Sequence, residues 1–159
     1  MKYVTYQAGG GARVGRLDGA TVLDVGFAGD MIAFIEAGAP TGQERPVPDA
    51  RLLAPIKPRS LRDFLAFEGH LKNAFKNLGR EIPPEWYEVP AFYRSVGDTV
   101  VGPDVELAWP SYTSQLDHEL ELAAVIGRPC RDVSPAEALD YFFGFIIWND
   151  MFARDVQRR

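Results

Sequence analysis

The sequence predicts an α+β fold that is mainly β, with a small N-terminal domain followed by a larger one. Residues 116–126 alternate apolar and polar residues with the period of two expected of strands, and residues 3–25 resemble a strand, a glycine-rich turn and a hairpin. Only one long segment, residues 60–79, repeats its apolar residues with the period of a helix. We place the two domains at residues 1–57 and 58–159, because the Pro- and Gly-bearing stretch "GAPTGQERPVPDA" is typical of a linker.

In the N-terminal domain, a first strand and a β-hairpin are expected. The segments "RVGRL" and "ATVLDV" flank Asp18 and Gly19, which form a strong two-residue turn signal. Asp30 should cap a short helix, "MIAFIEAG", that ends at Gly38. The glycines at 9–11 predict only a turn, since they lack the lysine and hydroxyl of a phosphate loop. After the linker, "RLLAPIKP" is expected to form a further strand.

The segment "SLRDFLAFEGHLKNAFKNLG" predicts one amphipathic helix that ends at Gly79. On its helical wheel, Asp63 and His70 are nearly superimposed at the edge of the apolar stripe, where a polar group can face a cleft. The next stretch, "EIPPEWYEVPAFYRSVG", predicts a long packed loop, because it is rich in proline and aromatic residues. Short strands are expected around "TVVG" and "VELAWP".

The stretch "LDHELELAAVIG", residues 116–127, predicts a strand with two different faces. One face is apolar and looks suited to burial, and it carries Leu120, Leu122, Ala124 and Ile126. The other face carries Glu119 and Glu121. Further on, the capping box "SPAE" at 134–137 predicts a short helix through about Phe142, and "GFIIWND" predicts a buried strand that ends at Asp150.

Glu119 and Glu121 raise an electrostatic question, because their positions on one strand face are roughly 6.5 to 7 Å apart. At an effective dielectric constant near 20, their repulsion is on the order of 2 kcal/mol. The face could be solvated, it could be neutralised by an arginine, or it could hold a metal ion. The continuation of this face into Ala123 and Val125, together with Asp150, favours a hard-cation site. Oxygen ligands favour Mg²⁺, Mn²⁺ or Ca²⁺ over Zn²⁺. Mg²⁺ is the first choice among these three ions.

From the sequence, several other polar residues could have either a structural or a functional role. Asp63 could simply belong to a capping box at residues 60–63, and His70 could be a structural histidine at a helix edge. His118 points away from Glu119 and is discounted as a ligand. Cys130 is the only cysteine, which excludes an internal disulfide.

Composition excludes some partners. The chain has 22 acidic and 17 basic residues, a formal net charge of −5 and no long basic run, so nucleic acid is not expected as a partner. We expect no membrane association, because no apolar stretch approaches the roughly 20 residues needed to span a bilayer. The N-terminus lacks an apolar signal core, and a cytoplasmic location is therefore expected.

Three motifs, "RDFLAFEGH", "LDHELELAAVIG" and "GFIIWNDMFARDVQ", occur in one order and together resemble the signature of the fumarylacetoacetate hydrolase family, which includes fumarylacetoacetase-like and acylpyruvate hydrolase-like proteins. The close resemblance covers about residues 59–157. It implies a mixed β-sandwich or roll with a metal site, usually in a homodimer. Related proteins continue well beyond "ARDVQ", so the resemblance implies that this chain is an N-terminal portion whose partner is a downstream C-terminal portion of the same enzyme.

The resemblance also implies roles for individual residues. The family's metal ligands fall on Asp63, Glu119, Glu121 and Asp150, and its general-base histidine falls on His70. Arg154 and Gln157 fall where the family has an arginine near the metal and a substrate-contacting glutamine. Leu65 stands where fumarylacetoacetate hydrolase itself has a substrate-contacting tyrosine, which argues against fumarylacetoacetate as the substrate.

The implied activity is that of a metal-dependent hydrolase that cleaves a carbon–carbon bond in a β-diketo or acylpyruvate-type acid. The metal ion would chelate the 2-oxo acid end of the substrate, and His70 would deprotonate the attacking water. One alternative is a 2-oxo acid decarboxylase, tautomerase or dehydratase of the same family. An alternative from another class is a noncatalytic metal-binding or assembly module.

Overall fold

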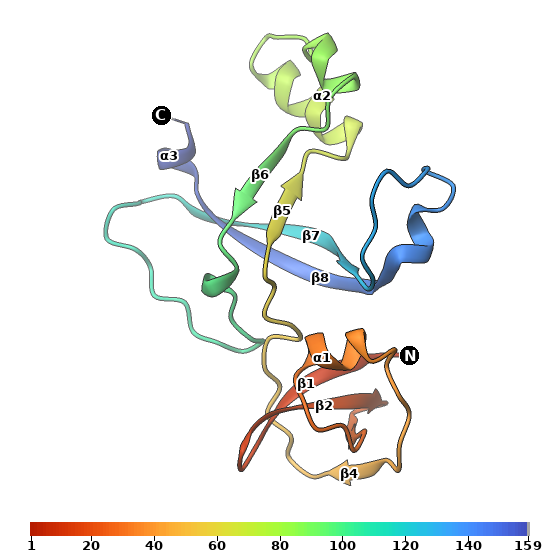
Figure 1. Ribbon diagram of the computed structural model, residues 1–159. Coiled ribbons are helices and arrows are strands. Elements are labelled where there is room, and N and C mark those ends of the chain that lie inside the picture. The colour runs from red at the N-terminus through yellow and green to blue at the C-terminus, as the bar shows by residue number, and fades with distance from the viewer. Residues whose placement is uncertain (159) are drawn as a thin grey trace. The chain divides into compact units, whose positions relative to one another are not determined.

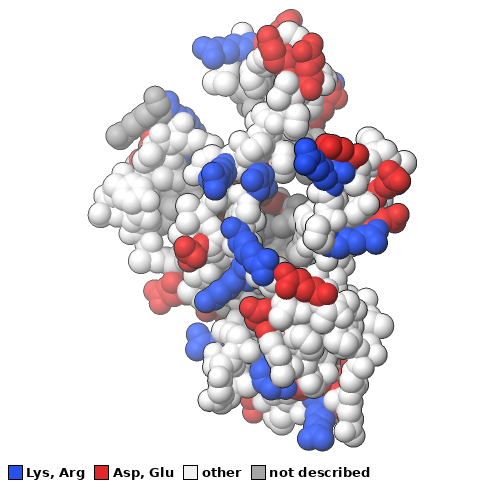
Figure 2. Space-filling model, in the orientation of Figure 1, with Lys and Arg blue, Asp and Glu red and all other residues white. Residues whose placement is uncertain are grey.

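The computed structural model describes residues 1–158 and has an α+β fold in which strands predominate, as predicted (Figure 1). The chain divides into two compact units. The first consists of residues 1–56 together with the chain from Gly102 onward, and the second consists of residues 57–101. Among the described residues, no helix is long and apolar enough to cross a membrane. In Figure 2, acidic and basic side chains are interspersed over the face shown.

A four-stranded antiparallel sheet forms the N-terminal part of the first unit. Its strands lie in the order β1 (Tyr3–Ala8), β2 (Gly11–Asp18), β3 (Thr21–Asp24) and β4 (Arg45–Val47). The hairpin predicted at Asp18 and Gly19 is confirmed, and Gly19 adopts the left-handed conformation that its turn requires, with φ of 58°. The predicted linker was wrong in part, because it contains β4. Pro46 is tolerated there because β4 is an edge strand.

The segment "RLLAPIKP", predicted to be a strand, makes only an isolated bridge between Leu52 and Tyr6. Its backbone also makes a hydrogen bond to β1, since Leu53 N donates to Thr5 O at 2.9 Å. Proline residues on both sides of this contact remove backbone donors and prevent a longer ladder. The segment therefore runs beside the sheet without extending it as a regular strand.

Helix α1 (Met31–Glu36) begins where the sequence predicts. The Asp30 carboxylate caps it by accepting from Ala33 N at 2.8 Å. The buried core of the unit comprises Val14, Val25, Met31, Phe34 and Ile35. Val125 and Phe143 pack against this core, so residues far apart in the sequence share one apolar cluster.

A long antiparallel hairpin, β7 (Leu116–Ile126) with β8 (Phe142–Ala153), forms the rest of the first unit. Both strands were predicted, but β8 is not the buried strand expected, because its side chains alternate between exposed and half-buried, and it continues past Asp150 to Ala153. A register shift interrupts the ladder between Val125 and Ile126. The capping box before β8 is present, since the Ser134 hydroxyl bonds the Glu137 carboxylate at 2.6 Å. It leads only into the 3₁₀ turn η3 (Ala138–Tyr141), so the predicted short helix does not form. The strand expected at "VELAWP" is also absent from the described residues.

The expectation that the apolar face of β7 is buried was wrong for this chain. Leu120 is 78% exposed and Leu122 is 63% exposed, and on β8 the facing Ile147 is 76% exposed. The opposite face, which carries Glu119 and Glu121, is half-buried. The alternation and the partial burial of the glutamate face were thus predicted correctly, but the apolar face is exposed in this chain.

The second unit replaces the predicted single helix by a strand and a shorter helix. Its elements are β5 (Leu61–Phe64), α2 (Glu68–Asn77), the 3₁₀ turn η1 (Pro84–Tyr87), β6 (Phe92–Ser95) and the 3₁₀ turn η2 (Gly97–Thr99). β5 pairs with β6, and this pairing overrides the helical pattern of "RDFLAFEGH". The packing of Phe64 on Phe92, with ring centroids 5.2 Å apart, stabilises it.

These elements correct four predictions. Asp63 is on a strand and His70 is on a helix, so the two residues share no helical wheel and no capping box starts at Ser60. The loop predicted over residues 81–97 contains β6. The strand predicted at "TVVG" does not form, because Thr99 ends η2 and residues 100–102 have no regular secondary structure.

Candidate metal centre

The register of β7 and β8 brings three carboxylates to one face of the hairpin. Glu119 lies directly opposite Asp150, and Glu121 follows Glu119 by two residues on the same face. One carboxylate oxygen of Glu121 and one of Asp150 lie within 4.8 Å of each other. All three residues are half-buried, so water screens their repulsion incompletely. This face is therefore suited to a positive ion.

Arg154 provides one positive charge on the same face. Its Nη1 atom lies 2.5 Å from Glu119 Oε1, and its Nε atom lies 3.0 Å from Asp117 Oδ2. Nη1 also donates to Gln157 Oε1 at 3.0 Å. An arginine partner was one of the three alternatives raised by the sequence, and the structure realises it for Glu119.

Arg154 and Asp117 each stabilise the ionised form of the other. The hydrogen bond from Arg154, followed by one from the backbone of His118, lowers the pKa of Asp117. Desolvation by burial acts to lower the pKa of Arg154, but its bonds to Glu119 and Asp117 outweigh this effect, and the pKa is raised. The guanidinium also lies over the ring of Phe152, 5.2 Å from its centroid. Arg154 is therefore a fixed, permanently charged donor.

Asp117 has a role that was not predicted from the sequence, although its position two residues before Glu119 was a usable signal. The same alternation that places Glu119 and Glu121 on one face also places Asp117 there. In the structure, Asp117 orients the guanidinium that contacts Glu119. It is a positioning residue for this site.

Asp155 anchors the short helix α3 (Arg154–Gln157), which carries both Arg154 and Gln157. Its carboxylate accepts from the Thr113 hydroxyl at 2.5 Å and from Ser114 N at 3.1 Å. The Thr113 bond is the main reason why the pKa of Asp155 is lowered. Thr113 is 7% exposed. These contacts join residues more than 40 positions apart, so no local sequence pattern could have revealed them.

Asp63 and His70 lie in the second unit, and their roles stay predictions. Asp63 is half-buried on β5, opposite Tyr93. His70 is exposed in the first turn of α2, where its backbone N–H donates to Phe67 O at 3.0 Å. His118 lies on the other face of β7 from Glu119, as predicted, and its side chain is 68% exposed.

The donor set of the hairpin face consists of carboxylate oxygens. Such oxygens match Mg²⁺, Mn²⁺ and Ca²⁺, whereas a structural Zn²⁺ site would normally include cysteine or histidine ligands. The residues present therefore fit a hard divalent cation.

Comparison with protein families agrees with this chemistry. The family model for the C-terminal part of fumarylacetoacetate (FAA) hydrolase matches residues 60–159. The chain belongs to the fumarylacetoacetate hydrolase family. A second model, for the N-terminal part of Rv2993c-like proteins, matches residues 1–55 of this family member.

Individual proteins and solved structures are also similar to this chain. Protein Rv2993c of Mycobacterium tuberculosis is 33% identical over 118 residues, which are 74% of this chain and 42% of that protein. The mitochondrial oxaloacetate tautomerase FAHD1 of Bos taurus is 58% identical over 48 residues, which are 30% of this chain and 22% of that protein. The structure of a fumarylacetoacetate hydrolase from Exiguobacterium antarcticum superimposes with a TM-score of 0.79 at 28% identity, over 99% of this chain and 58% of that one. The chain thus spans about half the length or less of these relatives.

Proposed function

We propose that the chain carries the metal centre of a hydrolase that cleaves a carbon–carbon bond in a β-diketo or acylpyruvate-type acid. The observation that carries this proposal is the convergence of Glu119, Glu121 and Asp150 on one half-buried face of the β7–β8 hairpin. Buried or half-buried carboxylates repel one another unless a cation or a proton compensates them. Family membership supports a catalytic use of that cation.

The proposed metal ligands are Asp63, Glu119, Glu121 and Asp150. Mg²⁺ is the first choice, and Mn²⁺ or Ca²⁺ suit the same oxygen donors. When bound, the cation would supply Lewis-acid polarisation of the 2-oxo acid end of the substrate. Asp63 enters this proposal through the sequence resemblance.

Arg154 and Gln157 are proposed to bind the substrate's carboxylate. Arg154 is held by Asp117 and Glu119, so its guanidinium is oriented before a substrate arrives. Gln157 uses its carbonyl oxygen to accept from Arg154. Its amide N–H groups therefore remain the part of the side chain suited to donate to an anionic oxygen.

His70 is proposed to be the general base. A neutral imidazole ring nitrogen can take a proton from the water that attacks the distal carbonyl carbon. The bond between that carbon and the central carbon then breaks, and the electron pair remains with the departing enolate. The exposure of His70 on α2 leaves its ring accessible to such a water.

A second candidate activity is tautomerisation or decarboxylation of a 2-oxo acid. The name of the bovine relative, an oxaloacetate tautomerase, favours this candidate. Both activities would begin with the same bound oxo acid, and they differ in which bond breaks. Product analysis therefore separates them.

The exposed apolar face of the β7–β8 hairpin supports a proposal about partners. We define this face by Leu120, Leu122, Phe145 and Ile147, all of which are more than half exposed. Contiguous exposed apolar surface marks an interaction site. We propose that it is covered by the downstream C-terminal portion of the enzyme, which the longer relatives contain. A homodimer and a cytoplasmic location remain predictions.

The experiment is to incubate the chain with Mg²⁺ or Mn²⁺ and a panel that includes oxaloacetate and an acylpyruvate, and to identify the products by NMR. We expect carboxylic acid plus pyruvate from the acylpyruvate, loss of this activity in His70→Ala, and retained metal binding in that variant. His118→Ala is the matched control and should keep its activity. Hydrolysis that persists in His70→Ala would refute the assigned base. Keto–enol interconversion or CO₂ release without cleavage would favour the second candidate.

A further inference from the structure

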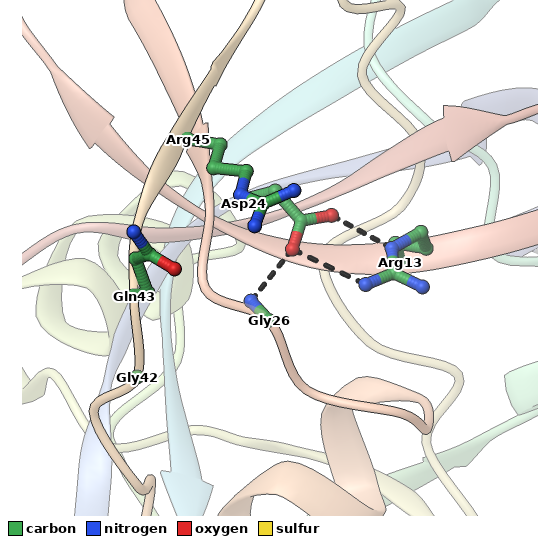
Figure 3. A pocket seen from close by; sticks show the side chains of 6 residues that line it. All are labelled: Arg13, Asp24, Gly26, Gly42, Gln43 and Arg45. Atoms are coloured by element: carbon green, nitrogen blue, oxygen red, sulfur yellow. Dashed lines mark hydrogen bonds and ion pairs between the residues drawn. The ribbon is translucent and has the colours of Figure 1, made fainter.

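An open pocket of about 440 Å³ lies against the N-terminal sheet (Figure 3). Its lining residues come from β2, the end of β3 and the segment that enters β4, and they are Arg13, Asp24, Gly26, Gly42, Gln43 and Arg45. None of these residues belongs to the candidate metal centre. The size of the pocket is near the lower end of the roughly 300–1,000 Å³ typical of small-molecule sites.

Asp24 is fully engaged within this pocket. It accepts from Arg13 Nε at 2.7 Å and from Arg13 Nη2 at 3.2 Å. It also accepts from the Tyr6 hydroxyl, and from Gly26 N at 2.6 Å. A carboxylate offers about four acceptor positions, so Asp24 has no capacity left for a further donor. The bond to Arg13 is the largest reason why the pKa of Asp24 is well below its usual range, and Asp24 thus offsets the charge of Arg13.

Arg45 is a second cation at the same pocket. It lies directly opposite Asp24 in the β3–β4 register. Within residues 1–158 it makes no ion pair or side-chain hydrogen bond, whereas Arg16, on β2, pairs with Glu44 at 2.7 Å. Figure 3 shows Arg45 beside Asp24, and Gln43 on the segment that leads to Arg45; both line the pocket. The pocket therefore has one uncompensated positive charge next to an amide donor.

We propose that this pocket binds a small anion through a carboxylate group, with Arg45 and Gln43 as the donors. A guanidinium presents two parallel N–H groups that match a planar carboxylate. A phosphate group is usually held by several free backbone N–H groups. In this pocket, the N–H of Gly26 already donates to Asp24, which favours a carboxylate over a phosphate.

The test is a titration of the chain with succinate, followed by ¹H–¹⁵N NMR with side-chain amide and guanidinium signals included. We expect saturable shifts of the Gln43 amide and the Arg45 Nε–H. Arg45→Gln should weaken binding about tenfold or more, as expected for the loss of a charge-assisted hydrogen bond. Gln43→Ala should weaken it to a smaller extent. Arg51→Gln removes the same charge from an exposed residue that does not line the pocket, and it should leave the affinity unchanged.

The outcomes that overturn the proposal are distinct. Equal weakening in Arg45→Gln and Arg51→Gln would mean that net charge alone is responsible. The absence of saturable shifts with succinate would mean that there is no site, and tighter binding of inorganic phosphate than of succinate would refute the carboxylate assignment. Glu119→Gln combined with Glu121→Gln should not affect succinate binding at this pocket. The proposal therefore stands or fails separately from the metal centre.

Discussion

Replacing Glu121 by glutamine is expected to stabilise the metal-free protein, although it removes a proposed metal ligand. Carboxylate oxygens of Glu121 and Asp150 lie within 4.8 Å of each other. At that separation, two full charges repel by about 1 kcal/mol at the dielectric constant of water and by about 3.5 kcal/mol at an effective value of 20. Both residues are half-buried, so the free energy of unfolding should rise by about 1 to 2 kcal/mol at low salt.

Adding the cation should reverse the order of stability. A ligand present at 100 times its Kd stabilises the folded state by about 2.7 kcal/mol, and the wild-type chain should gain this increment with Mn²⁺. Glu121→Gln should gain much less, because it has lost one ligand.

The assay is urea unfolding, followed by circular dichroism, in EDTA and in excess Mn²⁺. Glu106→Gln, at an exposed position outside the hairpin, is the control for net charge and should change neither measurement by more than about 0.5 kcal/mol. The reasoning would be refuted if Glu121→Gln lowered the stability of the metal-free protein. It would also be refuted if wild type and variant gained equal stability from Mn²⁺.

Three further outcomes are expected. Ile147→Gln on the exposed apolar face should change the free energy of unfolding of this chain by less than about 0.5 kcal/mol, and it should reduce binding of the dye ANS. A large loss of stability would mean that the Ile147 side chain is covered. The lowered pKa of Asp24 stabilises the folded state above the unfolded-state pKa of about 3.9. This contribution is lost as the pH falls through the folded-state pKa. Urea unfolding should therefore show a greater loss of stability between pH 5 and pH 2 in the wild type than in Asp24→Asn. Parallel losses in the two proteins would contradict the stabilising role of the Asp24 carboxylate. Asp155→Asn should weaken the anchor at Thr113 and cost about 1 kcal/mol, with faster amide exchange in α3; unchanged exchange would show that the anchor is not needed.

The strands β7 and β8 could each be predicted from the sequence because their signals are local, whereas their pairing was not predicted. The alternation in "LDHELELAAVIG" fixes which residues share a face, and this placed Glu119 and Glu121 together. The helix after Asp30 was equally predictable, because its cap and its terminating glycine lie within a few residues of it.

The errors arise where distant contacts decide the structure. "RDFLAFEGH" has a helical pattern, but pairing with β6, about 30 residues later, turns Leu61–Phe64 into a strand. The exposure of Leu120 could not be predicted either, since it depends on what packs against the hairpin. Likewise, the contact of Arg154 with Glu119 requires the register of β7 with β8, which the sequence does not specify.

The most direct test of the proposed metal centre is a calorimetric titration of the chain with Mg²⁺ and with Mn²⁺. The wild type is compared with Glu119→Gln/Glu121→Gln and with the control Glu81→Gln/Glu106→Gln, which removes the same charge from exposed residues outside the hairpin. We predict one well-defined site in the wild type and in the control, and loss of that site in the hairpin double variant. Equal binding in all three proteins would contradict the proposal and would mean that the carboxylate face does not need a metal ion.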